Sequence, residues 1–174
     1  LELPTLPPLG GAPSLSGGAP LAVYVDLPGG EEPLTIVPLD PEGPGLALGT
    51  AQGVVKRVTP DHPARSDWEV IALRDGDRVV GAAPLRDGTE DLVFVTSDGQ
   101  LLRFPASAVR PQGRAAGGMA GIRLSPGASV VHFGAVPVGA DAVVVTSAGS
   151  ADAWPPCMTI FSTRSRASSR RFGV

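Results

Sequence analysis

The sequence has almost no cysteine: Cys157 is the single one among 174 residues, so no disulfide can form within the chain. This excludes a small secreted fold held together by disulfides and favours an intracellular compartment. No apolar run reaches the roughly 18 to 20 residues that a membrane-spanning helix needs. The N-terminus also lacks the basic and apolar regions of a signal peptide. We therefore expect a cytoplasmic protein without membrane contact.

The patterns of an enzyme site are missing too. His62 and His132 lie about 70 positions apart, and together with Cys157 they do not have the ligand spacing of a zinc site. No nucleophile elbow, phosphate-binding loop or dinucleotide-binding glycine motif occurs. The only tyrosine, Tyr24, lies in an apolar, strand-like context and is interpreted as a packing residue. We assign no catalytic residue, no metal ligand and no cofactor to this chain.

A basic character of the whole chain is absent as well, since the formal net charge is -3 and the pI about 5.3. Any contact with nucleic acid would therefore need a local patch. Such a patch is present between Asp98 and Asp141, where four arginines occur without a single acidic residue. They are Arg103, Arg110, Arg114 and Arg123.

What the chain does have is an internal repeat. Leu46 to Arg57 and Leu92 to Arg103 share a leucine, a threonine, a glycine, two apolar residues and an arginine at an offset of 46 positions. A third copy from Ala142 to Gly149 keeps the threonine and the glycine. In the second copy, the glycine is Gly99, which can take the positive φ that a tight hairpin turn needs.

The repeat predicts the architecture. Units of about 46 to 51 residues with four short strands and no helical periodicity are typical of propeller-like blades, so we predict an all-β fold over residues 20–150. The units are a partial blade over about 20–40, full blades over about 45–90 and 91–137, and the start of another from 141. Two or three blades cannot close a ring, so the native domain is longer or the disc is incomplete and open.

The two ends differ from the blades. Residues 1–19 are rich in proline and glycine, as in a linker, and because the chain opens without methionine we expect it to be the C-terminal part of a longer protein. Residues 151–174 form an atypical tail with four arginines and no acid after Cys157. This tail is interpreted as a disordered segment or a sequence read out of frame after about 152, or alternatively as an arm that touches phosphates.

Landmark residues of both units resemble the blade repeat of the C-terminal domain of the gyrase A and bacterial topoisomerase IV A subunits. In the second unit they are Thr96, Gly99, Arg103, Val109, Arg110, Gly113, Arg114, Gly118, Gly121, Ile122, Leu124, Gly127, Val130 and Val131. In the first they are Thr50, Gly53, Lys56, Arg57, Leu73, Asp75, Gly76, Asp77, Val80, Gly81 and Ala82.

The resemblance implies a β-pinwheel, a propeller variant whose blades exchange strands, with duplex DNA bending around a basic outer rim. The parent would be a type IIA topoisomerase. Its N-terminal breakage-reunion domain would carry the catalytic tyrosine, and its ATPase subunit would use ATP and Mg.

One family feature is missing. Gyrase carries a box rich in glutamine, arginine and glycine that lets it wrap DNA, whereas residues 112–118 contain one arginine. This favours a topoisomerase IV-like subunit, or a gyrase fragment whose box lies elsewhere.

The basic, glycine-rich segment after Arg103 is the predicted DNA-binding surface, because the guanidinium fork suits phosphate and glycine leaves the backbone accessible. We expect phosphate contacts first from Arg110, Gln112 and Arg114, then from Lys56, Arg57, Arg103 and Arg123. Alternatively, these cations pair with carboxylates, or the acidic chain is a propeller-like platform for protein partners that does not bind DNA.

Overall fold

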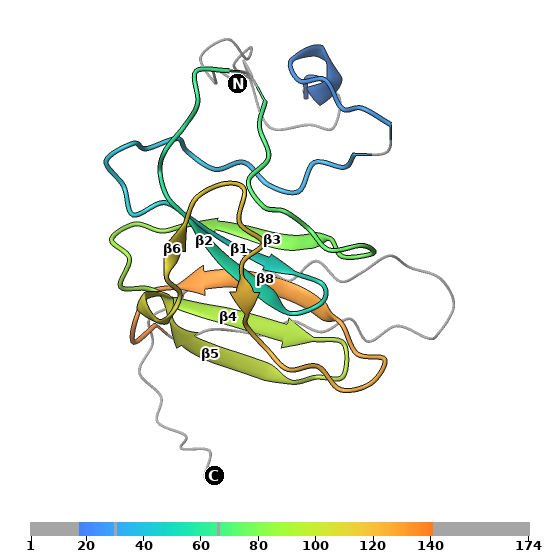
Figure 1. Ribbon diagram of the computed structural model, residues 1–174, viewed down its shortest axis with the longest axis vertical. Helices are drawn as coiled ribbons and strands as arrows, with labels where there is room; N and C mark the ends of the chain where they lie inside the picture. The colour runs from blue at the N-terminus through green and yellow to red at the C-terminus, as the bar shows by residue number, and fades with distance from the viewer. Residues whose placement is uncertain (1–17, 30, 66, 141–174) are drawn as a thin grey trace.

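The computed structural model describes residues 18–29, 31–65 and 67–140 (Figure 1). Over these residues the regular structure consists of eight β-strands and two 3-10 helices, without an α-helix, which confirms the predicted all-β class. Within the same ranges no helix is long and apolar enough to cross a membrane.

The strands form two sheets that correspond to the two full repeat units. The first sheet has the order β3-β1-β2-β6, with β7 also paired to β2, and the second has the order β5-β4-β8. In the first sheet the strands are β1 (Leu46–Thr50), β2 (Val54–Val58), β3 (Val79–Pro84), β6 (Pro111–Gln112) and β7 (Met119–Ala120). In the second they are β4 (Asp91–Thr96), β5 (Leu101–Pro105) and β8 (Val130–Val136).

The threonine and glycine of the repeat build the same hairpin turn twice. Thr50 Oγ1 accepts the Val54 N–H at 3.1 Å, and Thr96 Oγ1 accepts the Gln100 N–H at 2.9 Å. Gly53 and Gly99 close these turns with φ values of 81° and 80°, a region that glycine enters without steric cost. These residues are repeat landmarks because each one satisfies the geometry of a local turn.

In each unit the last strand pairs with the first strand of the same unit. Turns at Gly76 and Gly127, both with positive φ, lead into β3 and β8, which pair antiparallel with β1 and β4 respectively. Both pairings contain a register shift just before the repeat threonine, at Gly49/Thr50 and at Val95/Thr96. The two units therefore share their turns, the order of their three long strands and the position of the register shift.

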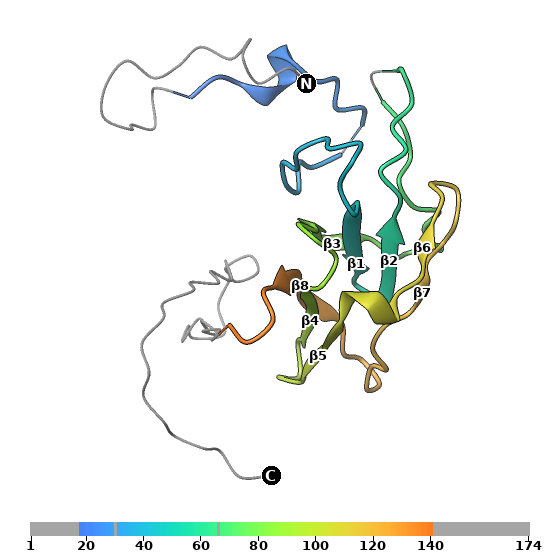
Figure 2. The same ribbon diagram turned by 90° about the vertical axis from the view of Figure 1, so that its left-hand side faces the viewer.

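Strand exchange joins the units, as the resemblance implied. Strands β6 and β7 belong to the second unit in sequence, yet they run alongside β2 of the first (Figure 2). Arg57 and Val58 pair in parallel with Pro111 and Gln112, and β7 pairs antiparallel with the start of β2. As a consequence, β2 has neighbours on both sides, whereas β5 pairs only with β4 among the described residues.

The core lies between the two sheets. Phe94 of β4 and Phe133 of β8 are buried with ring centroids 4.9 Å apart, and Ala47 and Val55 of the first sheet join the same cluster. Burial of each large apolar side chain stabilises the fold by about 1.5 to 3 kcal/mol. A smaller cluster of Leu48, Val58 and Ile71 covers the far face of the first sheet.

The expected partial blade is wrong. Within the described part of 20–40, the chain forms one 3-10 helix (Leu21–Val23) and no strand, and Val23, Leu34, Ile36 and Leu39 are exposed. The strands are shared unequally between the units: β1 to β3 lie in the first and β4 to β8 in the second, and the short β6 and β7 of the second unit join the sheet of the first. The blade start from 141, the tail 151–174 and residues 1–17 of the linker lie outside the described residues.

Candidate nucleic-acid interface

The arginine- and glycine-rich segment 110–118, called the crossing from here on, leaves the second blade and lies along β2 of the first. A short 3-10 helix (Ala106–Ala108) precedes it, and the side chains of Ala106 and Val109 are buried in the core. Because these two residues anchor the chain, Arg110 emerges directly at the surface, where it is exposed.

Backbone hydrogen bonds hold the crossing at two points along its length. Thr59 N–H donates to the Gln112 carbonyl at 3.2 Å, and Ala72 N–H donates to the Ala116 carbonyl at 3.3 Å. The crossing is therefore tied to the loop between β2 and β3 as well as to β2 itself.

Gly118 brings the end of the crossing unusually close to β2. Its φ is 83°, and an added Cβ would lie 2.7 Å from both Val54 Cγ1 and the Val55 carbonyl oxygen. Only glycine fits this position without displacing backbone. The landmark glycine of the family repeat thus has a packing reason here.

Lys56 was expected to contact phosphate, and the structure corrects this. Its side chain is fully buried (0% exposed), and Nζ donates to the carbonyls of Val70 at 2.7 Å, Arg114 at 2.6 Å and Ala116 at 2.7 Å. Burial lowers the pKa of Lys56 from 10.5, while the three carbonyls favour its charged form. All three donors of the ammonium are used inside the protein, so no phosphate can reach it.

Two further predicted phosphate contacts are less available: Arg103 is paired with a carboxylate, and Arg57 is half-buried. Arg103 Nε donates to Asp91 Oδ2 at 2.6 Å, and its Nη2 forms an ion pair with the same oxygen. Arg57 is half-buried, with Nη2 close to Gly88. For Arg103 the alternative of a carboxylate pair therefore describes the structure.

The other four predicted residues form no ion pair with a carboxylate among the described residues, and they differ in exposure. Arg110 and Arg123 are exposed, and Gln112 and Arg114 are half-buried on the crossing. Within the described ranges Arg114 makes no ion pair, and its buried Nη1, like Gln112 Oε1, has no hydrogen-bond partner. Two arginines of the crossing, Arg110 and Arg114, thus form no ion pair within the described part of the chain.

An acidic hollow that sequence reasoning missed lies beside the crossing. It has a volume of about 640 Å³, and residues 113–116 of the crossing form one wall. The loop after β2 forms the other wall. It contributes Asp61, Arg65, Asp67, Trp68 and Glu69. Three carboxylates thus share this hollow with Arg114, which lies more than 40 positions away in sequence.

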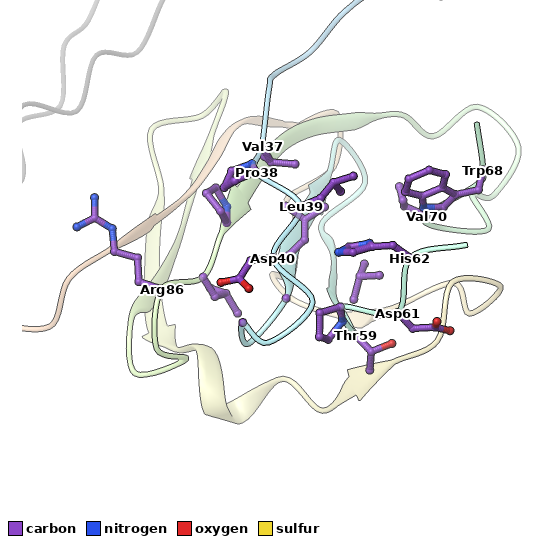
Figure 3. A pocket seen from close by; sticks show the side chains of 17 residues that line it. Val37, Pro38, Leu39, Asp40, Thr59, Asp61, His62, Trp68, Val70 and Arg86 are labelled. Atoms are coloured by element: carbon purple, nitrogen blue, oxygen red, sulfur yellow. The ribbon is translucent and has the colours of Figure 1, made fainter. Parts of the chain in front are cut away.

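A second cavity, of about 560 Å³, lies at the far face of the first sheet (Figure 3). Its apolar lining includes Leu46, Val58 and Val70, and the rings of His62 and Trp68 lie side by side at 6.2 Å. In the part of the chain that the structure describes, no group of three or more potential ligands could hold a metal ion.

Comparison with known families points to one group. Residues 69–86 and 90–137 match the family model described as DNA gyrase C-terminal domain, beta-propeller. The DNA gyrase A protein of Mycobacterium bovis (strain BCG / Pasteur 1173P2) is 36% identical over 115 residues, which cover 63% of this chain and 14% of that protein. The DNA gyrase A protein of Staphylococcus aureus (strain NCTC 8325 / PS 47) is 35% identical over 122 residues, which cover 67% of this chain and 14% of that protein.

Solved structures agree with the fold. The crystal structure of the C-terminal domain of DNA topoisomerase IV has a TM-score of 0.65 and 28% identity, over 73% of this chain and 41% of that one. The structure of the DNA gyrase A C-terminal domain has a TM-score of 0.59 and 24% identity, over 73% of this chain and 43% of that one. This likeness supports the fold alone. The chain therefore spans about a seventh of its curated relatives and less than half of the domains whose structures it resembles.

Proposed function

Since this chain belongs to the C-terminal β-propeller family of the DNA gyrase and topoisomerase IV A proteins, and has their β-pinwheel fold, we propose that it binds duplex DNA through phosphate contacts and guides its bending. The observation that carries this proposal is the crossing, which presents Arg110 and Arg114 free of ion pairs in the described residues. Unpaired guanidinium groups bind phosphate well, and release of the DNA counterions supplies the affinity.

The proposed contacts differ in rank. Arg110, Gln112 and Arg114 share the crossing and form the centre of the surface. Arg123 is exposed beyond β7 and extends it. Arg57 and Arg103 become peripheral candidates, because the first is half-buried and the second is paired with Asp91, and Lys56 is removed from the contact surface.

We further propose that the parent protein is the DNA-cleaving chain of an ATP-dependent type IIA topoisomerase in the bacterial cytoplasm. Its breakage-reunion domain would cleave the DNA, and its ATPase partner would supply ATP and Mg. In this arrangement the present domain performs no chemistry; it holds and bends the duplex for strand passage.

Fluorescence anisotropy with a labelled duplex tests the proposal. We expect weak binding whose logarithm falls linearly with the logarithm of salt concentration, and the substitutions R110A and R114A together should lower the slope by about 2. The matched control is R74A with R78A, which removes the same charge from an exposed turn. Binding that R110A with R114A leaves unchanged contradicts the proposed phosphate contacts. No binding even at low salt contradicts DNA binding altogether and favours the protein platform instead.

A further inference from the structure

The buried lysine beneath the crossing is the most unusual feature of the described structure. Transfer of an ammonium group from water into a protein interior costs much free energy unless every donor finds an acceptor. Here Lys56 Nζ meets that condition with three carbonyls at 2.6 to 2.7 Å. The acceptors are all backbone atoms, so the ammonium fixes main chain and has no side-chain carboxylate among these partners to neutralise it.

The three carbonyls come from two segments that are distant in sequence. Val70 belongs to the loop before β3, whereas Arg114 and Ala116 belong to the crossing. Because the carbonyls of residues 114 and 116 both accept from the same nitrogen, the backbone of the crossing must curve around the lysine at Arg114. One ammonium group therefore sets the position of the residue that is proposed to meet phosphate.

The repeat offers an internal comparison. The position equivalent to Lys56 in the second unit is Leu102, which is half-buried on β5. In the described residues no crossing covers β5, and its side chains are more exposed than those of β2. In this chain, lysine occurs on the strand that a crossing covers and leucine on the strand without one.

We propose that Lys56 is a positioning residue for DNA binding: its ammonium group holds the crossing against β2 and thereby presents Arg110 and Arg114 to the phosphates. This inference rests on the proposed function. Lys56 acts through the crossing and not by touching DNA, since its side chain is fully buried and its donors are engaged. Its charge also adds to the positive potential beneath the crossing.

Hydrogen exchange and DNA affinity, measured on the same variants, test this role. In K56M we expect faster exchange of the amides in 112–118 and at Ala72, whose N–H is bonded to Ala116. Duplex affinity at about 50 mM salt should fall by about tenfold, the contribution of one phosphate contact. The matched control R78M removes the same charge from the exposed turn before β3 and should change the affinity by less than about twofold.

A double-mutant cycle separates positioning from general stability. If Lys56 acts through the crossing, K56M should lower the affinity of R114A much less than that of the parent protein. The variant G118A should reproduce the effect without removing a charge, because its Cβ would push the crossing off β2. Should K56M lack the native circular dichroism spectrum, K56Q, which keeps two N–H donors, takes its place.

The outcomes distinguish the two proposals. A parent protein that does not bind duplex DNA at low salt overturns the proposed function, and the positioning role with it. A parent that binds, with K56M or K56Q folded and equal to it in affinity and in exchange over 112–118, overturns the positioning role alone. Additive losses in K56M with R114A would also contradict it.

Discussion

Phe133 of β8 occupies the space above Gly49 of β1. A Cβ added at Gly49 would lie 2.5 Å from Phe133 Cβ and closer still to the ring, and an added Cβ at Gly81 of β3 would also meet Phe133. The absence of a side chain at Gly49 lets the aromatic ring pack directly onto β1, and its absence at Gly81 makes room for the backbone carbonyl of Phe133. The two blades meet at this contact.

Gly49→Ala should therefore destabilise the protein by about 1 to 3 kcal/mol, because the extra methyl group overpacks a buried contact. Urea unfolding monitored by fluorescence measures the change. The matched control is Gly113→Ala, since nothing lies within 4 Å of a Cβ at that position. Partial recovery of stability in G49A with F133L would identify the ring as the cause, and an unaltered midpoint in G49A would contradict this contact.

The turn threonines should be sensitive to loss of the hydroxyl. Thr50→Val keeps the shape of a side chain that is 0% exposed but removes the acceptor for the Val54 N–H. A buried N–H left without an acceptor costs about 1 to 3 kcal/mol, so thermal unfolding should occur at a lower temperature. Thr35→Val, at an exposed site before the first strand, serves as the control. Equal stability of the two variants would show that the hydroxyl does not support the hairpin.

The acidic hollow should weaken DNA binding. Carboxylates that share the hollow with Arg114 repel an approaching phosphate, so Asp61→Asn or Glu69→Gln should raise the affinity about two- to threefold at low salt. The gain should disappear near 1 M salt, where the Debye length is about 3 Å. Glu31→Gln, an exposed residue before the first strand, is the control for net charge. Equal gains from all three variants would exclude a local effect.

His132 should make stability depend on pH. Burial of this side chain lowers its pKa from the ordinary value of 6.5, so the unfolded chain binds a proton more tightly than the folded protein. Stability should be complete above about pH 6.5 and fall as the pH decreases from there through the lower pKa of the folded state. Unfolding midpoints of the parent and His132→Gln between about pH 5 and 7.5 measure this, and the variant should lose less stability on acidification. The same decline in both proteins would assign it to other groups.

Local features of the fold could be predicted from the sequence. The turns at Gly53 and Gly99 and their threonines depend on residues within about four positions of each other, so the repeat revealed them directly. The strand-like pattern over 20–40 led to a wrong prediction. Apolar residues such as Leu34 and Ile36 alternate there as in a strand, but they are exposed, and this segment pairs with no strand among the described residues.

Features that depend on distant contacts could not be predicted in this way. Lys56 was expected to be a surface cation. It lies two positions from Val54 and from Val58, so the three side chains share one face of β2, and its apolar neighbours were a sign of burial. Glu69 and Arg114 share a hollow only because the crossing lies across the first blade. The exchange of strands itself was implied by the family resemblance and by nothing in the spacing.

That exchange has a consequence for the order in which the molecule is made. When the ribosome has synthesised as far as Pro105, β1, β2 and β3 are complete, but the residues that pair with the outer side of β2 follow only at 111–112 and 119–120. The first blade must therefore wait for part of the second, with the buried positions of β2 unprotected until then. Domains usually fold as units during synthesis, and we expect that unit to include both blades here, because β2 pairs with strands of each.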